Sequence, residues 1–336
     1  MSDLKTLKKN FMKTKNLFRL TILAASFSTL LLGCKKDNAN STGDGTATTA
    51  ANVQTSSEDL TMVSNESDAV SDDAIAALNG NVAISGTAER TDGISIKISI
   101  CDATISYDTT STTKTITIVY NGSNCSGNRT RTGTVTIAVP RGQHWSKAGS
   151  SVTINIDALT ITRVKEGKSI TINGTKTITN TSGGLILNLA TLGSITTDVD
   201  ANLSITFASG LIRSWQVARH KVYTYANGIV ETVTGTHSDG TNNNIAIWGT
   251  NRFGVDFTDM ITSPKIYSQS CNFELTSGQN TITRSDKISS VITYGLDANG
   301  DVATSCPISS AGGYYYAKLV WTNGNNGKTF TYIYPY

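Results

Sequence analysis

The stretch Val152-Thr153-Ile154-Asn155-Ile156-Asp157-Ala158-Leu159-Thr160-Ile161 decides the fold. Branched apolar residues alternate with polar ones up to Ile156, and this period of two is typical of a strand with one buried and one wet face. The apolar phase then shifts at Leu159 and Ile161, which predicts a β-bulge. Similar alternation recurs along the chain after Gly80, so we expect an all-β fold.

Short links join these alternating runs. Five Asn-Gly pairs lie between them, and such pairs favour hairpin turns because both residues tolerate positive φ: Asn121-Gly122, Asn227-Gly228, Asn299-Gly300, Asn323-Gly324 and Asn326-Gly327. Strands joined by short links are antiparallel neighbours. The sequence therefore predicts a large antiparallel meander of hairpins, either a curved half-barrel-like sheet or a sandwich. In the last hairpin, residues 314–321 pair with residues 328–334.

The N-terminal stretch has the order of a lipoprotein signal peptide. Five lysines and Arg19 precede an apolar run over residues 20–32, which is short for a spanning helix of roughly 20 apolar residues. The run ends in a lipobox, Leu31-Leu32-Gly33-Cys34, so we expect cleavage after Gly33 and acylation of Cys34. A secretory signal with a chance cysteine is the alternative. Either Met1 or Met12 starts the precursor.

This processing site divides the chain into three parts. Residues 1–33 are the signal peptide, and residues 34–66 are expected to be a flexible polar tether because they lack the apolar surface to fold. Residues 67–336 form the antiparallel β-domain, which begins with one short helix over residues 67–80. Acylated Cys34 would anchor the protein to the outer membrane, facing the periplasm or the cell surface.

The net charge of +3 belongs to the signal peptide. Residues 1–33 hold six of the 28 Lys and Arg residues and one of the 25 acidic residues, so the remaining chain is slightly acidic. Nucleic-acid binding requires a basic surface. We therefore expect no nucleic-acid partner.

Four cysteines follow Cys34, and an even number in an exported chain favours disulfides. Three pairings are open, and we favour Cys101–Cys125 with Cys271–Cys306 because each would join neighbouring strands. No CxxC motif or histidine cluster indicates a metal. We expect no cofactor.

Candidate catalytic residues are scattered. The carboxylates are Glu231, Asp256, Asp259 and Glu274, and the histidines are His144, His220 and His237. No spacing ties any two of them together, so we expect no enzyme. The run from Asp297 to Asp301 could surround Ca²⁺ but lacks the closing Glu of an EF-hand, and a hairpin turn explains it better. Arg129 and Arg131 share a strand face, where they would hold an anion or, as we favour, pair with Asp102 or Asp108.

Aromatic residues raise a glycan-binding hypothesis because sugars stack on exposed rings. The candidates are Trp145, Trp215, Trp248, Trp321, Tyr314, Tyr315 and Tyr316. Aromatics on strands more often belong to the core. A glycan or another envelope protein is therefore a weaker expectation than the membrane partner reached through Cys34.

Several segments resemble a group of uncharacterised Bacteroidota lipoproteins. The similar segments are residues 115–118 and 129–135, residues 170–180, residues 249–254, and Tyr294-Gly295, together with Cys125, Cys271 and Cys306. The resemblance extends roughly from residue 90 to residue 310 and implies location and fold rather than an activity. Val119-Tyr120-Asn121-Gly122 stands where the group has an acidic Asp-Phe-Gly, so any role of that Asp is absent.

The sequence thus predicts a lipid-anchored exported protein with a non-catalytic binding or structural role at the cell envelope. A glycan-binding accessory role in nutrient capture is the alternative, followed by a hydrolase whose site the sequence hides.

Overall fold

The computed structural model describes residues 44–86, 100–307 and 313–336, which all belong to one compact unit, Gly43–Tyr336. The helices are α1 Asp44–Asn79, α2 Val82–Ser85 and α3 Leu189–Leu192, with 3₁₀ turns η1 Ile186–Asn188 and η2 Gln269–Cys271. The strands are β1 Ala103–Asp108, β2 Lys114–Ser123, β3 Arg129–Val139, β4 Ser150–Arg163, β5 Ser169–Asn180, β6 Ser194–Phe207, β7 Ile212–Tyr225, β8 Ile229–Gly235, β9 Ile245–Thr250, β10 Asp256–Ser268, β11 Glu274–Arg284, β12 Ile288–Leu296, β13 Tyr316–Asn323 and β14 Thr329–Pro335.

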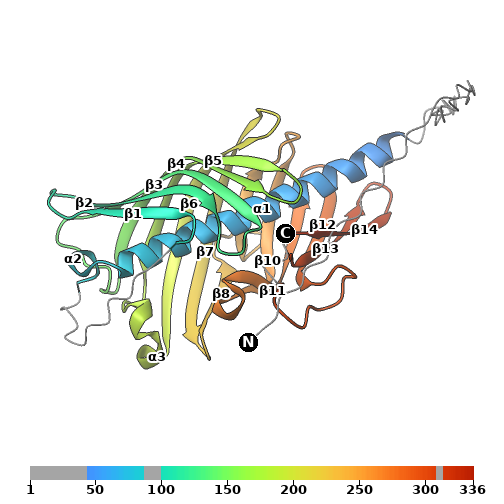
Figure 1. Ribbon diagram of the computed structural model, residues 1–336. Coiled ribbons are helices and arrows are strands. Elements are labelled where there is room, and N and C mark those ends of the chain that lie inside the picture. Colours follow the sequence, from blue (N-terminus) through green and yellow to red (C-terminus); the bar gives the residue numbers. More distant parts are fainter. Residues whose placement is uncertain (1–43, 87–99, 308–312) are drawn as a thin grey trace, which may run out of the picture. The chain divides into compact units, whose positions relative to one another are not determined.

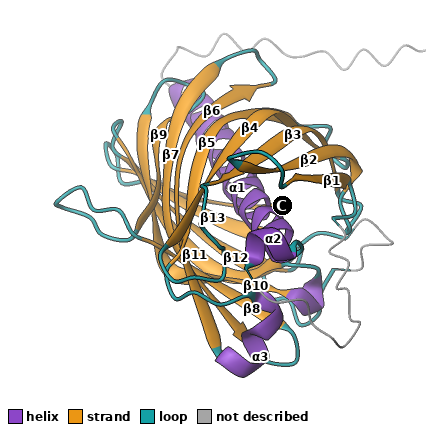
Figure 2. Ribbon diagram, turned by 90° about the vertical axis from the view of Figure 1, so that its left-hand side faces the viewer, coloured by secondary structure: helices purple, strands orange, loops and turns teal. Residues whose placement is uncertain are grey.

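All fourteen strands form one antiparallel sheet in which neighbours in sequence pair in space. The one departure is that β8 and β9 share the place between β7 and β10, β9 pairing with one end of these long strands and β8 with the other. The predicted antiparallel meander is therefore confirmed. Because there is a single sheet, and it curves around α1, the curved alternative holds and the sandwich does not (Figures 1 and 2).

Residues 152–161 lie in β4, which contains the predicted bulge. Val152, Ile154 and Ile156 are buried, the register shifts between Ile156 and Leu159, and Leu159 is again buried. Ala158 adopts a φ of 49°, and a Cβ on Gly133 of the neighbouring strand would lie 2.6 Å from its carbonyl oxygen. Glycine is required at that close approach.

The expected tether is wrong from Asp44 onward. Helix α1 begins there, and the helix expected over residues 67–80 is only its C-terminal part. Every residue from Ser57 to Asp68 is buried inside the sheet. Polar composition indicated disorder, but the sheet supplies the partners that these polar side chains need. Residues 34–43 lie outside the described residues.

The inner face of the sheet explains this polar helix. In β7 the inward positions run Trp215, Val217, Arg219, Lys221 and Tyr223, so two cations share the phase of the core residues. Buried charges require partners, and the carboxylates of α1 supply them.

Of the five Asn-Gly pairs, four lie in turns as predicted. Asn121-Gly122 does not, because it continues β2, where Asn121 pairs with Thr132. The final hairpin is confirmed, with Trp321 opposite Phe330. Among the described helices, none has the length and apolar character needed to cross a membrane.

Candidate ligand-binding site

Helix α1 is fully enclosed by the sheet along one part of its length and partly exposed along the next. Ser57 to Asp68 are buried on all faces, whereas Ala69, Asp72, Asp73 and Ala76 are only half-buried. Positions spaced by three, four and seven residues lie on one face of a helix. That face, together with Asn65 one turn earlier, borders a cavity of about 640 Å³.

The cavity is lined by polar side chains of α1 and by apolar side chains of other segments. Asn65, Asp72 and Asp73 lie on the helix side. An apolar wall comes from other segments, and polar residues such as Asn124 and Gln269 also line the cavity; the apolar wall consists of Ile100, Ile186, Leu187, Ile229, Phe273 and Leu275. These come from segments far apart in sequence, which the curvature of the sheet brings together.

Both predicted disulfides are present and flank the cavity. Cys101 and Cys125 have Cα atoms 5.2 Å apart, and Cys271 and Cys306 have Cα atoms 5.3 Å apart. Cys125 lines the cavity, and Cys271 precedes the lining residue Phe273 by two positions. The bonds tie together loops that would otherwise be free to move away from the cavity.

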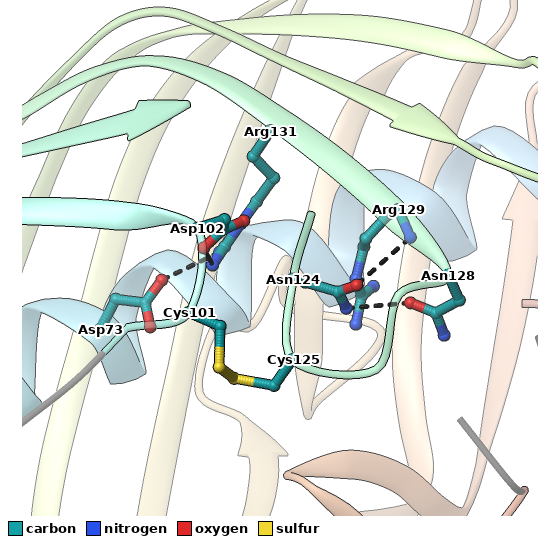
Figure 3. Close-up of a disulfide and its surroundings, with 8 residues drawn as sticks. All are labelled: Asp73, Cys101, Asp102, Asn124, Cys125, Asn128, Arg129 and Arg131. Carbon is teal, nitrogen blue, oxygen red and sulfur yellow. Dashed lines mark hydrogen bonds and ion pairs between the residues drawn. A yellow bond between two sulfur atoms is a disulfide. The ribbon is translucent and has the colours of Figure 1, made fainter. Parts of the chain in front are cut away.

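Arg131 organises one end of the site beside the first disulfide (Figure 3). Its Nε and Nη2 donate to the two oxygens of Asp102 at 2.6 and 2.7 Å, and its Nη1 donates to Asp73 Oδ2 at 2.9 Å. The hydroxyl of Tyr120 donates to the same Asp73 oxygen at 2.8 Å. Burial raises the pKa of Asp73, and Arg131 opposes that shift. The predicted partner Asp102 is therefore confirmed.

Asp108, the other proposed partner of these arginines, lies elsewhere. Its carboxylate accepts hydrogen bonds from Thr110 and Ser111 in the turn after β1, and the Ser111 hydroxyl above all lowers its pKa to about 2.

Arg129 joins the two sides of the curved sheet. Its Nη1 donates to Glu66 Oε1 of α1 at 2.5 Å, and its Nη2 lies 3.5 Å from Glu274 Oε1 at the start of β11. Asn128 Nδ2 donates to the same oxygen of Glu274 at 3.2 Å. Strands distant in sheet order thus meet at this end of the cavity.

Phe273 is held toward the cavity in an unfavourable backbone conformation. Asn272 and Phe273 have φ values of 55° and 57°, which bulky side chains rarely adopt. The Phe273 N–H donates to the Ser268 carbonyl at 2.8 Å and helps to hold this conformation, while its ring remains exposed. Such strain costs about 1–3 kcal/mol and often accompanies functional sites.

The closed part of α1 carries an ionic network centred on Asp68. Arg219 pairs with Asp68 Oδ2, and the hydroxyl of Tyr267 donates to the same oxygen at 2.8 Å. Burial alone would raise the pKa of Asp68, but Arg219 and Lys221 overcome it, so the pKa lies well below its usual value.

Other charged groups of this interface are shifted mainly by burial. Burial lowers the pKa of Lys176 to about 7 and that of Lys265 to about 8. Lys176 Nζ donates to the hydroxyls of Ser67 and Ser71 at 2.9 and 2.8 Å, and Lys265 Nζ donates to Ser64 at 2.6 Å.

Of the four candidate carboxylates, only Glu274 lines the cavity. Glu231 is fully buried with an oxygen 2.6 Å from Lys221 Nζ, and burial raises its pKa well above the usual range. Asp259 is also fully buried, accepts from Asn280 at 2.8 Å and has its pKa raised by burial to about 6. Asp256 is exposed and accepts from Thr250.

The candidate histidines are not brought together at the cavity. His220 Nδ1 lies 2.6 Å from Asp198 Oδ1, and the ring of His237 stacks on Trp248 at 4.0 Å between centroids. His144 packs against Gly86. None of them lines the cavity.

The run from Asp297 to Asp301 is a turn in which the Asp297 carboxylate accepts the N–H groups of Asn299 and Asp301 at 2.9 and 3.0 Å. Within the part of the chain that the structure describes, no group of three His, Cys, Asp or Glu residues is arranged to hold a metal ion.

The tryptophans do not form an exposed platform. Trp145, Trp215 and Trp321 are buried, and Trp248 is half-buried against His237. Tyr315 is buried, while Tyr314 and Tyr316 are half-buried. Cys34 and the lipobox residues Leu31, Leu32 and Gly33 lie outside the described residues.

Sequence reasoning missed the helix wall of the cavity and its cationic partners. The sequence did contain an indication of them, because some basic residues occupy the same alternating positions as the buried apolar residues of their strands. Lys176 lies in phase with the buried Ile172 and Ile178, and Lys265 lies in phase with Tyr267. Cations at inward positions imply an acidic element inside the sheet, and residues 58–73 were the available acidic segment.

Comparison with known proteins gives no match: no family model, no curated protein sequence and no solved structure matches this chain.

Proposed function

We propose that this protein is an exported, lipid-anchored binding protein that holds a small amphipathic molecule in the cavity beside α1. The observation that carries the proposal is the cavity of about 640 Å³. Small-molecule sites typically measure about 300–1,000 Å³, with mostly apolar walls and a few placed polar groups. The apolar wall around Phe273 and the polar face of α1 have this division.

Export and anchoring complete the proposal. Two disulfides fit an oxidising compartment outside the cytoplasm. The lipobox ending at Cys34 supplies the anchor, and we assign the protein to the outer membrane and to the group of Bacteroidota lipoproteins that its sequence resembles.

Binding fits the cavity better than hydrolysis does. Hydrolysis by paired carboxylates requires one acid and one base that are free to act on the substrate. Here each cavity-lining carboxylate is paired with a cation of the sheet: Asp72 with Lys221, Asp73 with Arg131 and Glu274 with Arg129. We therefore propose a non-catalytic role.

Titration with the neutral fluorescent probe N-phenyl-1-naphthylamine tests the proposal. Saturable binding is expected for the natural protein and for Ala51→Trp, in which the new ring lies on an exposed part of α1. Ala76→Trp places the same ring in the cavity and should weaken binding at least tenfold. Far-UV circular dichroism checks that both variants fold.

Equal probe binding by Ala76→Trp and Ala51→Trp would overturn the proposal, as would the absence of binding by the natural protein. Oligosaccharide binding that Ala76→Trp leaves unchanged would favour the glycan-binding alternative instead.

The anchor has its own test. The membrane-bound natural protein should have an intact mass that begins at acylated Cys34, and Cys34→Ser should appear in the soluble fraction. A natural protein that begins after Gly33 without an acyl group would contradict the assignment. Protease treatment of intact cells then reports which leaflet carries it.

A further inference from the structure

The polar side chains of α1 that line the cavity offer mainly hydrogen-bond acceptors. Asn65 is 9% exposed and lines the cavity, and its Oδ1 has no hydrogen-bond partner among the described residues. That oxygen is covered by protein atoms, so the acceptors open to the cavity are those of the carboxylates.

Three carboxylates add acceptors to the cavity, Asp72 and Asp73 from α1 and Glu274 from β11. Asp72 Oδ1 accepts from Lys221 and Tyr223, at 2.8 and 3.0 Å. Asp73 and Glu274 likewise use one oxygen each, Oδ2 and Oε1. Within the described part of the chain the second oxygen of each has no hydrogen-bond partner, and the side chains are 23%, 18% and 12% exposed.

The cations of the wall are already matched. Arg131 is held by both oxygens of Asp102 and by Asp73, and Arg129 is held by Glu66 and Glu274. Asp102 and Glu66 do not line the cavity, and each balances the charge of one guanidinium. The charge that remains toward the cavity is therefore negative.

The carboxylates of α1 that line the cavity, Asp72 and Asp73, are neighbours near the C-terminal end of the helix. Ile75 and Ala76 continue the helix wall with apolar surface. An elongated ligand can therefore lie along α1 with its polar end at the acceptors and its hydrocarbon against Phe273 and Leu187.

We propose that the cavity binds an amphipathic amine, whose protonated ammonium group donates hydrogen bonds to Asp72 and Asp73 while its hydrocarbon part lies against the apolar wall. This inference rests on the proposed binding function and names the ligand class. An ammonium group offers donors only, which matches a wall of acceptors, whereas a carboxylate would meet like charge.

Competition among three eight-carbon probes tests the ligand class. Octylamine, octanol and octanoate differ only in the head group, and each is measured by displacement of N-phenyl-1-naphthylamine. Octylamine should bind at least tenfold more tightly than octanoate, with octanol between them. Asp72→Asn should reduce the preference for octylamine over octanol at least threefold, and Asp239→Asn, at an exposed loop position, should leave it unchanged.

The outcomes separate this inference from the function on which it rests. Octanol binding reports whether the cavity of Asp72→Asn is intact. If octylamine and octanoate compete equally while Ala76→Trp blocks all three probes, the amine assignment is wrong and the binding function stands. If Ala76→Trp changes nothing, both are wrong.

Discussion

Helix α1 has two different environments within one sheet. From Ser57 to Asp68 every residue is buried, and carboxylates such as Asp68 are used up by the cations of the inner wall. Beyond Asp68 one face is open, and Asp72 and Asp73 bond to the sheet through only one oxygen each. The same kind of side chain thus secures the helix in the first environment and faces a cavity in the second.

The charges of a buried polar helix can therefore serve ligand binding as well as folding. Buried ion pairs often contribute little net stability but cost much when one partner is lost. In the open part this cost is smaller, because water or a ligand can replace a missing partner. Substitutions should therefore act on folding in the closed part and on binding in the open part.

Removing Asp68 should have the largest effect. Asp68→Asn leaves Arg219 and Lys221 short of a buried counter-charge, so the free energy of unfolding should fall by about 3–5 kcal/mol. Asp72→Asn should cost less than half as much, because Lys221 keeps Asp68 at 3.7 Å and Glu231 at 2.6 Å. Urea denaturation of both variants measures the difference, and equal losses would remove the distinction between the two environments.

Loss of a disulfide should be nearly as costly. Cys101 and Cys125 are 24 residues apart, and closing a loop of that length contributes about 3 kcal/mol. The double serine variant should lose stability by that amount and also bind N-phenyl-1-naphthylamine less tightly, because Cys125 lines the cavity. Unchanged probe binding would show that the disulfide does not shape the cavity.

The same substitution at two alanines of α1 compares the closed and the open environment. Ala74 is fully buried, so Ala74→Leu should overpack the core and cost about 1–3 kcal/mol. Ala76 faces the cavity, and Ala76→Leu should change the free energy of unfolding by less than about 0.5 kcal/mol. Thermal and urea unfolding provide the values, and a reversed order would contradict the assignment of the open face.

The pH dependence of stability should be the smallest effect. The folded pKa of Lys176 is about 7, below the ordinary 10.5, so above pH 7 the unfolded chain binds a proton that the folded chain has lost. Stability should therefore rise between pH 7 and 8, by at most about 1.4 kcal/mol per pH unit from this group. Lys176→Met should reduce that rise to the part that Lys265 contributes, and Lys147→Met, at an exposed position, should keep it in full. An undiminished rise in Lys176→Met would show that Lys176 does not cause it.

Most of the fold could be predicted from the two-residue periodicity of the strands. The phase shift before Leu159 predicted a bulge because one residue reverses the face of every later side chain, and the even cysteine count led to both disulfides. Asn121-Gly122 failed as a turn, because an Asn-Gly pair permits a turn without requiring one and here β2 continues to pair with β3 past it.

The candidate site was mostly beyond sequence reasoning. Glu274 and Arg129 were noted, but their meeting depends on the curvature of the whole sheet. Residues 44–66 were assigned to a tether because their composition has no apolar stripe, and the cations that stabilise the helix lie more than a hundred residues away at Lys176, Arg219 and Lys265.

A crystal structure of the protein with octylamine tests the central claim most directly. We predict the alkylammonium in the cavity beside α1, with its nitrogen about 2.7–3.2 Å from a carboxylate oxygen of Asp72 or Asp73 and its chain against Phe273. Octylamine bound only elsewhere, or side chains filling the space next to Ala76, would contradict the account.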